Sequence, residues 1–211
     1  NPPQGYAPAG YVAKQAVATG KQYTTREMLK TKQFYLITFS LLLILPAYFI
    51  LNPLLMTLGV ERGLTEELAL VGVMVTGIAS AAGRLVVSWV SDKMGRKMAL
   101  YGINLLTLAA ILGMIFAQGI LFLVCIAVIA FSFGGASGVY AAVTADSFGT
   151  QHMGSNYGCA MLGFGVSALV FPLISNSLSG GGDYTLSFVV AAVTCVIALV
   201  LVALMKRPEK G

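Results

Sequence analysis

Arg84 is the one charged side chain in the interior of six long apolar segments of this 211-residue chain. It stands near the start of the run Gly83-Arg84-Leu85-Val86-Val87-Ser88-Trp89-Val90-Ser91-Asp92-Lys93-Met94-Gly95-Arg96-Lys97. A charge at membrane depth costs at least about 2.5–3.5 kcal/mol, so an intramembrane arginine is by default a functional site that faces protein or water. A planar guanidinium matches a carboxylate in bidentate geometry. Arg84 therefore predicts a binding site for a small organic anion.

Other side chains are predicted to share this site. Ser80 lies four residues before Arg84 on a stripe of small and polar residues that repeats every three or four positions: Gly77, Ser80, Ala81, Arg84, Ser88 and Ser91. Arg84 precedes Asp92 by eight residues, which places it roughly 12 Å inward from the following loop. Tyr48 and Asn52 share a face of the first segment and are expected to line the same polar interior. Ordinary hydrogen bonding between helices is the alternative for that pair.

A structural role is the alternative for Arg84 itself, with a carboxylate or helix-end carbonyl groups as its partner. No Asp or Glu occurs in the interior of the six segments, so an internal ion pair at that depth is not expected. A partner from protein outside this chain stays open at this point.

The elements that must position these residues are membrane-spanning helices. Apolar residues make up 57% of the chain and charged residues 10%, against about 25% charged residues in soluble domains. Six segments have the roughly 20 residues needed to cross hydrocarbon: 34–58, 67–91, 98–117, 120–143, 155–177 and 184–205. We expect an all-α integral membrane protein, a bundle of six transmembrane helices over 34–206. No room remains for a soluble catalytic domain, so neither an enzyme nor catalytic residues are expected.

The basic residues predict the orientation in the membrane, because loops rich in Lys and Arg stay cytoplasmic. They precede the first segment, separate the second from the third and follow the sixth: Lys14, Lys21, Arg26, Lys30, Lys32, Lys93, Arg96, Lys97, Lys206, Arg207 and Lys210. The other side carries Arg62 among acidic residues. We expect a multi-pass protein of the plasma (cytoplasmic) membrane with both termini cytoplasmic. The net charge of +5 reflects this bias and does not predict nucleic-acid binding.

The parts outside the bundle are short. Residues 1–33 form a polar stretch, expected to be a cytoplasmic linker in which Thr24 or Thr25 caps a short surface helix, and 207–211 form a cytoplasmic tail. Pro46 and the pair Asn52-Pro53 are expected to bend the first segment. The three cysteines and the single histidine do not predict a metal site, and no cofactor is expected.

The turn after the second segment combines opposite charges with a glycine. Asp92, Arg96 and Lys97 flank Gly95, which supplies backbone freedom. The fifth segment enters the membrane from the same side at 154–156, so the positive end of its helix is available to Asp92. We expect Asp92, Arg96 and that helix end to form a latch that holds this side closed. The alternative is that these basic residues only anchor the loop on the cytoplasmic side of the membrane, and the loop can have both roles.

Gly83-Arg84-Leu85, followed by Ser91-Asp92-Lys93-Met94-Gly95-Arg96-Lys97, resembles the signature loop of the major facilitator superfamily in its second-half copy. Ser88 departs from that pattern, which often has glycine there. The resemblance implies the carboxyl-terminal half of a twelve-helix transporter, with residues 1–33 as the central loop. It also assigns Gly83, Asp92, Gly95, Arg96 and Lys97 to the signature loop and implies a missing amino-terminal half of six helices as partner, with the lipid bilayer around both.

Two further stretches are similar to the oxalate/formate antiporter family within that superfamily: Tyr23-Thr24-Thr25-Arg26-Glu27-Met28-Leu29-Lys30-Thr31-Lys32-Gln33-Phe34 and Phe148-Gly149-Thr150-Gln151-His152-Met153-Gly154-Ser155-Asn156-Tyr157-Gly158. The family's oxalate exchanger grips its dianion with an arginine on the eighth helix, which Arg84 matches, and a lysine on the eleventh. Phe164 stands near the lysine position, so the second cation is missing. The resemblance then implies a secondary active transporter of a monocarboxylate, working by alternating access as an antiporter or proton symporter.

Two other functions stay open. One is a superfamily transporter of a sugar or drug, which deep aromatic, acidic and amide side chains would favour, and these are sparse here. The other is a membrane scaffold that keeps the fold and moves nothing, which predicts that Arg84 contacts protein rather than water.

Overall fold

The computed structural model describes residues 21–179 and 184–205. The expectations for the first part of the linker, for the loop at 180–183 and for the basic tail from 206 onward lie outside this range. Within it, all regular structure is helical, which confirms the predicted all-α class. The helices are α1 Thr25–Met28, α2 Lys32–Ile44, α3 Pro46–Glu61, α4 Glu66–Met94, α5 Arg96–Phe116, α6 Gly119–Phe148, α7 Met153–Ala160, α8 Leu162–Leu178 and α9 Thr185–Leu204.

Among the described residues, six helical stretches are long and apolar enough to cross a membrane: Lys32–Glu61, Glu66–Met94, Arg96–Phe116, Gly119–Phe148, Met153–Leu178 and Thr185–Leu204. They correspond to the six predicted segments. The first, second and fourth are longer than expected by five, four and six residues, because their helices continue into the polar residues at the ends of the apolar stretches. The fourth thus includes Asp146, which the sequence prediction had placed in the loop.

The first and fifth spans are each built from two helices. In the first, α2 ends at Ile44 and α3 begins at Pro46, because proline has no N–H to continue the ladder and fits the first helical position. This agrees with the bend predicted at Pro46. At Asn52-Pro53 the helix is not interrupted, since α3 continues through Pro53, and a bend there stays a prediction. In the fifth span the division falls at Met161, between α7 and α8, which the sequence did not predict.

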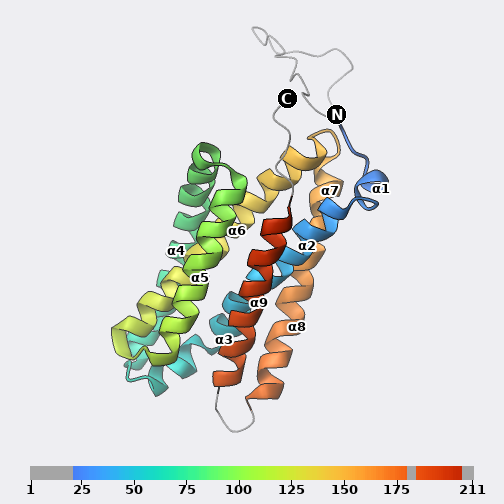
Figure 1. The fold of residues 1–211 in the computed structure, drawn as a ribbon. Coiled ribbons are helices and arrows are strands. Elements are labelled where there is room, and N and C mark those ends of the chain that lie inside the picture. Colours follow the sequence, from blue (N-terminus) through green and yellow to red (C-terminus); the bar gives the residue numbers. More distant parts are fainter. Residues whose placement is uncertain (1–20, 180–183, 206–211) are drawn as a thin grey trace, which may run out of the picture.

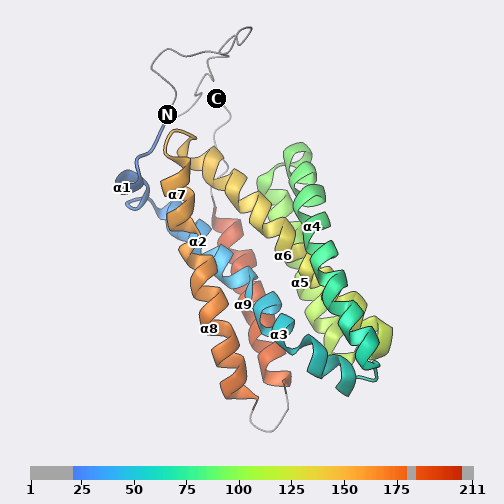
Figure 2. The ribbon, with the colours of Figure 1, turned by 180° about the vertical axis from the view of Figure 1, so that it is seen from behind.

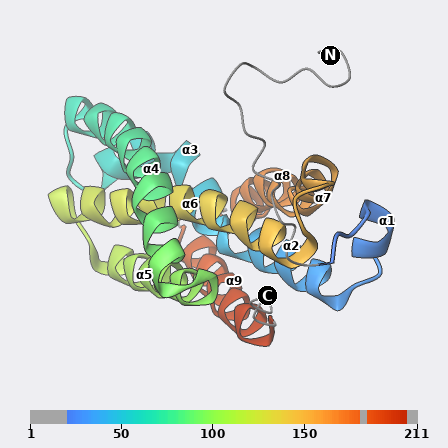
Figure 3. The same cartoon turned by 90° about the horizontal axis from the view of Figure 1, so that it is seen from above.

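The helices pack into a bundle (Figures 1, 2 and 3) in which α6 packs against α4, α5, α2 and α3. Helix α9 packs against α5 and α2, and α8 packs against α2 and α3. The α4–α5 turn, α1, the start of α7 and the end of α9 lie at one end, and the turns α3–α4 and α5–α6 lie at the opposite end (Figure 1). Two buried apolar clusters fill the interior. One contains Met28, Tyr140 and Phe148, and the other contains Phe122 and Phe188 near the opposite end.

The tightest contact joins α4 to α6. A Cβ atom at Gly83 would lie 2.0 Å from the carbonyl oxygen of Phe131, and one at Gly134 would lie 1.9 Å from that of Ser80. Only glycine permits this approach of two backbones, as is common between membrane helices. The contact fixes the rotation of α4 about its axis, and therefore the direction in which Arg84 points.

Candidate functional site

Arg84 lies on α4, one residue beyond the glycine that packs against α6, and its side chain is exposed. No hydrogen bond or ion pair joins it to residues 21–179 or 184–205. The guanidinium is near enough to Tyr48 on α3 for its charge to interact with the phenol. Arg84 is thus presented on the surface of this bundle without a partner from the described part of the chain.

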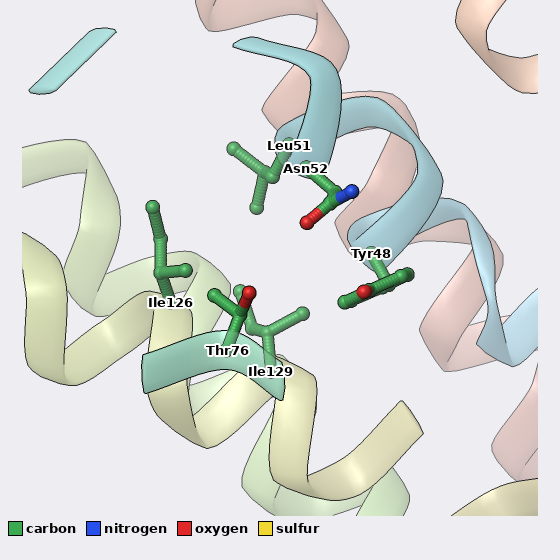
Figure 4. A pocket seen from close by; sticks show the side chains of 6 residues that line it. All are labelled: Tyr48, Leu51, Asn52, Thr76, Ile126 and Ile129. Atoms are coloured by element: carbon green, nitrogen blue, oxygen red, sulfur yellow. The ribbon is translucent and has the colours of Figure 1, made fainter. Parts of the chain in front are cut away.

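Tyr48 and Asn52 lie together, as predicted from their spacing. Both line a small cavity between α3, α4 and α6 (Figure 4), whose other lining residues are Leu51, Thr76, Ile126 and Ile129. The Asn52 amide and the Thr76 hydroxyl point into this cavity from opposite sides (Figure 4). Its volume is ≈ 10 Å³. That is about the room one water molecule needs, so a larger ligand requires either the open surface beside it or a movement of the helices.

Four aromatic rings form a wall next to this cavity. Tyr48 stacks on Phe133 of α6, with ring centroids 3.8 Å apart and planes 14° apart. Phe49 meets Phe133 and Phe164 edge to face at 5.6 Å and 5.2 Å, and Phe133 lies 5.9 Å from Phe164. The structure therefore brings Phe164 of α8 into one group with Tyr48. Sequence reasoning missed Phe49, Phe133 and Thr76, which carry no local signal that separates them from ordinary packing residues.

Ser80 occupies a different environment from Arg84, although the two share the predicted stripe. It is 7% exposed, and its backbone carbonyl faces Gly134 in the contact with α6. Ser91, on the same stripe, is also buried. The structure thus divides the stripe: Gly77, Ala81 and Arg84 are exposed, whereas Ser80 and Ser88 face glycines of α6. A ligand contact for Ser80 stays a prediction, and it requires α4 and α6 to separate.

The turn between α4 and α5 is centred on Gly95, whose φ of 95° is a conformation that favours glycine. Arg96 contacts three oxygen-bearing side chains there. It pairs with Asp92, donates to Ser91 Oγ at 2.7 Å, and its Nε donates to Asp146 Oδ2 at the end of α6 at 2.9 Å. Arg96 thus joins Asp92 to Asp146, which lies fifty residues away in sequence and was not expected here. That these contacts act as a latch stays a prediction.

Lys97 and the fifth span also have specific partners. Lys97 Nζ donates to the carbonyl oxygens of Ala203 and Met205 at 2.6 Å and 3.0 Å, where a cation is favourable at the end of α9. Asn156, at the start of the fifth span, accepts from Thr25 Oγ1 and donates to the carbonyl of Tyr23, both at 2.9 Å. The segment before the first span thus occupies the helix end that was expected to meet Asp92.

The predicted cap of the short helix α1 is present. The Thr24 side chain accepts from the backbone N–H of Glu27, and the Glu27 carboxylate accepts from Thr24 in return. These hydrogen bonds, from the Thr24 backbone and then its hydroxyl, hold the pKa of Glu27 below its usual value. Met28 is fully buried in the core cluster of the bundle, whereas Leu29 is exposed.

The described residues contain no group of three or more His, Cys, Asp or Glu side chains that could hold a metal ion. Cys125, Cys159 and Cys195 are free thiols. What the described residues offer instead is an exposed cation, Arg84, whose charge acts on Tyr48, and a cavity lined by Tyr48 and Asn52 next to the aromatic wall. This arrangement can bind a small anion by charge and by hydrogen bonds, and it has no nucleophile–base pair for covalent chemistry.

Among the described residues, six helical stretches of membrane-spanning length, two of them in tight contact through glycines, define the chain as a polytopic membrane protein. The family model of the Major Facilitator Superfamily matches residues 2–162 and 37–211, so the chain belongs to that superfamily. Since this is a family of transporters, the chain is not an enzyme, and its six helices correspond to one half of the fold.

Two curated proteins are similar to this chain. The oxalate:formate antiporter of Oxalobacter formigenes is 25% identical over 204 residues, which are 93% of the chain and 49% of that protein. The uncharacterized MFS-type transporter YhjX of Escherichia coli (strain K12) is 28% identical over 170 residues, which are 74% of the chain and 41% of that protein. The chain thus spans about half the length of these relatives, or less.

Proposed function

We propose that the chain is the carboxyl-terminal half of a secondary active transporter that carries a small organic anion by alternating access, as an antiporter or proton symporter. The observation that carries this proposal is Arg84: a cation on a membrane-spanning helix, exposed, near Tyr48, and without a partner among the described residues. A membrane charge of this kind needs a counterion. A carboxylate that enters between two halves of the transporter supplies one.

The surroundings of Arg84 favour a monocarboxylate. The fifth span, Met153–Leu178, contains no Lys or Arg, and its Phe164 belongs to the aromatic wall. One cation balances one negative charge, whereas a dianion would leave the second charge against apolar rings. The similar protein from Oxalobacter formigenes is named as an exchanger of oxalate and formate. On this reasoning formate, lactate or pyruvate suits the site better than oxalate.

The proposed orientation follows the charges. Arg26, Lys30, Lys93, Arg96 and Lys97 lie at the end of the bundle that holds α1 and the α4–α5 turn (Figure 1). By the positive-inside rule this end faces the cytoplasm. We place the protein in the plasma membrane, with the amino-terminal six-helix half as the partner that closes the site over Arg84.

Ligand-induced thermal stabilisation of the purified protein tests the assignment. Formate, lactate, pyruvate, oxalate, a sugar panel and chloride are compared on the wild type, Arg84→Ala, Arg84→Lys and Arg26→Ala. A ligand at a hundred times its Kd stabilises the folded state by about 2.7 kcal/mol. We expect a monocarboxylate to raise the melting temperature of the wild type and of Arg26→Ala, which removes an exposed cation away from the site.

In Arg84→Ala this rise should vanish, and Arg84→Lys should keep only part of it, because an ammonium lacks the bidentate geometry. Equal stabilisation of the wild type and Arg84→Ala by carboxylates would contradict the site. Stabilisation by sugars alone would favour the transporter of another solute. If no solute stabilises the wild type, and none is taken up by proteoliposomes, the result would support the alternative of a membrane scaffold that transports nothing.

A further inference from the structure

A groove is formed by side chains of α2 and α9. These two helices lie away from α4, which carries Arg84 (Figures 1 and 3). The groove has a volume of ≈ 470 Å³ and is lined by Lys32, Tyr35, Leu36, Phe39, Leu201 and Leu204. That volume lies in the range of small-molecule sites, about 300–1,000 Å³. The buried sides of both helices, including Ile37 and Val202, belong to one core cluster, so the floor of the groove is fixed by packing.

The lining residues form an ordered series along α2. Positions 32, 35, 36 and 39 share one helix face, with the charge at the end of the helix and the aromatic rings below it. Tyr35 and Phe39 are 49% and 50% exposed, and Leu204 on α9 is 62% exposed. On a membrane-spanning helix, large apolar side chains with this much exposed surface can pack against the acyl chains of lipids. The groove is therefore apolar along most of its length and carries one positive charge, at its mouth.

Lys32 is the charge at that mouth. It is exposed and has no hydrogen bond or ion pair with the part of the chain that the structure describes. It is also the first residue of α2, where the helix dipole disfavours a cation, and the first turn of α2 holds no acidic residue. The neighbouring cation Lys97, by contrast, is bound to the carbonyl groups at the end of α9. An external anion would offset the cost at Lys32.

We propose that this groove binds an anionic phospholipid, with its phosphate at Lys32 and an acyl chain along Tyr35, Phe39, Leu201 and Leu204. Basic pockets between transmembrane helices on the cytoplasmic side bind anionic headgroups in this way. Both helices belong to candidate membrane spans, so the surrounding bilayer supplies the lipid. A soluble anion would neutralise Lys32 but leave the apolar part of the groove without a ligand. A zwitterionic lipid would fill the groove without balancing the lysine.

Photo-crosslinking in vesicles tests this site with native side chains. The full-length protein is reconstituted with phosphatidylglycerol or phosphatidylcholine that carries a diazirine on one acyl chain, and labelled peptides are mapped by mass spectrometry. We expect phosphatidylglycerol to label peptides that contain 35–39 and 201–204 about five times more than phosphatidylcholine, as one lysine near an anionic surface allows. Lys32→Gln should bring this ratio close to one.

Lys30→Gln is the matched control, because Lys30 lies two positions earlier, is exposed and does not line the groove. It should keep most of the preference. Equal labelling by both lipids would overturn the proposal, and so would an equal loss in Lys30→Gln and Lys32→Gln, which would indicate general surface attraction. Native mass spectrometry of the delipidated variants provides a second reading. There, too, unchanged phosphatidylglycerol binding by Lys32→Gln counts against the site.

Discussion

Gly83 and Arg84 are neighbours on α4 but lie on different faces of the helix: the face of Gly83 is packed against α6, and the face of Arg84 is open. At Gly83 even a methyl group is excluded, because a Cβ atom would lie 2.0 Å from the Phe131 carbonyl oxygen. At Arg84 the longest basic side chain is exposed and meets no partner among the described residues. The packed face determines where the open face points. A cation can therefore be presented at a fixed depth and direction by contacts that it does not make itself.

Arg62, just beyond α3, shows how the same residue type behaves when its role is structural. It donates to the carbonyl oxygens of Met114 and Ala117, and its guanidinium lies 5.4 Å and 5.6 Å from the ring centres of Phe122 and Phe188. The fold thus surrounds Arg62 with partners and gives Arg84 none within residues 21–179 and 184–205. Under the proposed function, this difference distinguishes Arg62, a structural arginine, from Arg84, a ligand-binding one.

The largest expected effect is on the packed face. Gly83→Ala should destabilise the protein by about 3 kcal/mol, since overpacking a tight contact forces backbone shifts. The free energy of unfolding in mixed detergent micelles measures it. Gly102→Ala on α5 is the matched control, because nothing lies within 4 Å of a Cβ atom there, and it should change stability by less than about 1 kcal/mol. Equal effects of the two variants would show that the α4–α6 contact is looser than described.

The next effect compares the two arginines. Arg62→Ala should lower the free energy of unfolding by about 2 kcal/mol, since it removes charge-assisted hydrogen bonds and two cation–π contacts. Arg84→Ala, in the absence of ligand, should change it by less than about 0.5 kcal/mol, as at other sites without partners. The same micelle titration measures both variants. A loss at Arg84 as large as that at Arg62 would mean that Arg84 has a protein partner, and the ligand assignment would fall.

Much of the fold could be predicted from the sequence because hydrophobic length is a local property. Six apolar segments, the interruption at Pro46 and the glycine of the α4–α5 turn depend on residues near each other in the chain. The depth of Arg84 in its segment followed in the same way. Hydropathy contains no signal for the division at Met161, where no proline stands.

The contacts across the bundle could not be predicted in this way. Ser80 and Arg84 share a stripe in sequence, but the glycines of α6 draw only Ser80 into the packed contact. Asp146 joins Arg96 only because α6 extends past its apolar stretch and ends beside the α4–α5 turn. The rings of Phe49, Phe133 and Phe164 come from three helices. Each of these depends on how helices rotate and end, which the sequence of one helix does not specify.

The smallest expected effect is the loss of ligand affinity on substitution of Tyr48, a residue that contacts α6 and also interacts with Arg84. The Tyr48 ring stacks on Phe133, and the Tyr48 hydroxyl group interacts electrostatically with Arg84. Tyr48→Phe keeps the stacking and removes the hydroxyl, so stability without ligand should be nearly unchanged. If the hydroxyl donates to a bound carboxylate, the affinity should fall by roughly 2- to 10-fold, as expected for one hydrogen bond of about 0.5–1.5 kcal/mol.

Ligand titration of the thermal shift measures this affinity, with Phe49→Leu as the control that alters the aromatic wall but removes no hydroxyl. A weaker affinity in Tyr48→Phe alone would place the anion between the phenol and Arg84. If only Phe49→Leu weakens binding, Tyr48 acts through packing. In that case the polar contacts to the carboxylate would come from Arg84, from Asn52 or Ser80, or from the partner half.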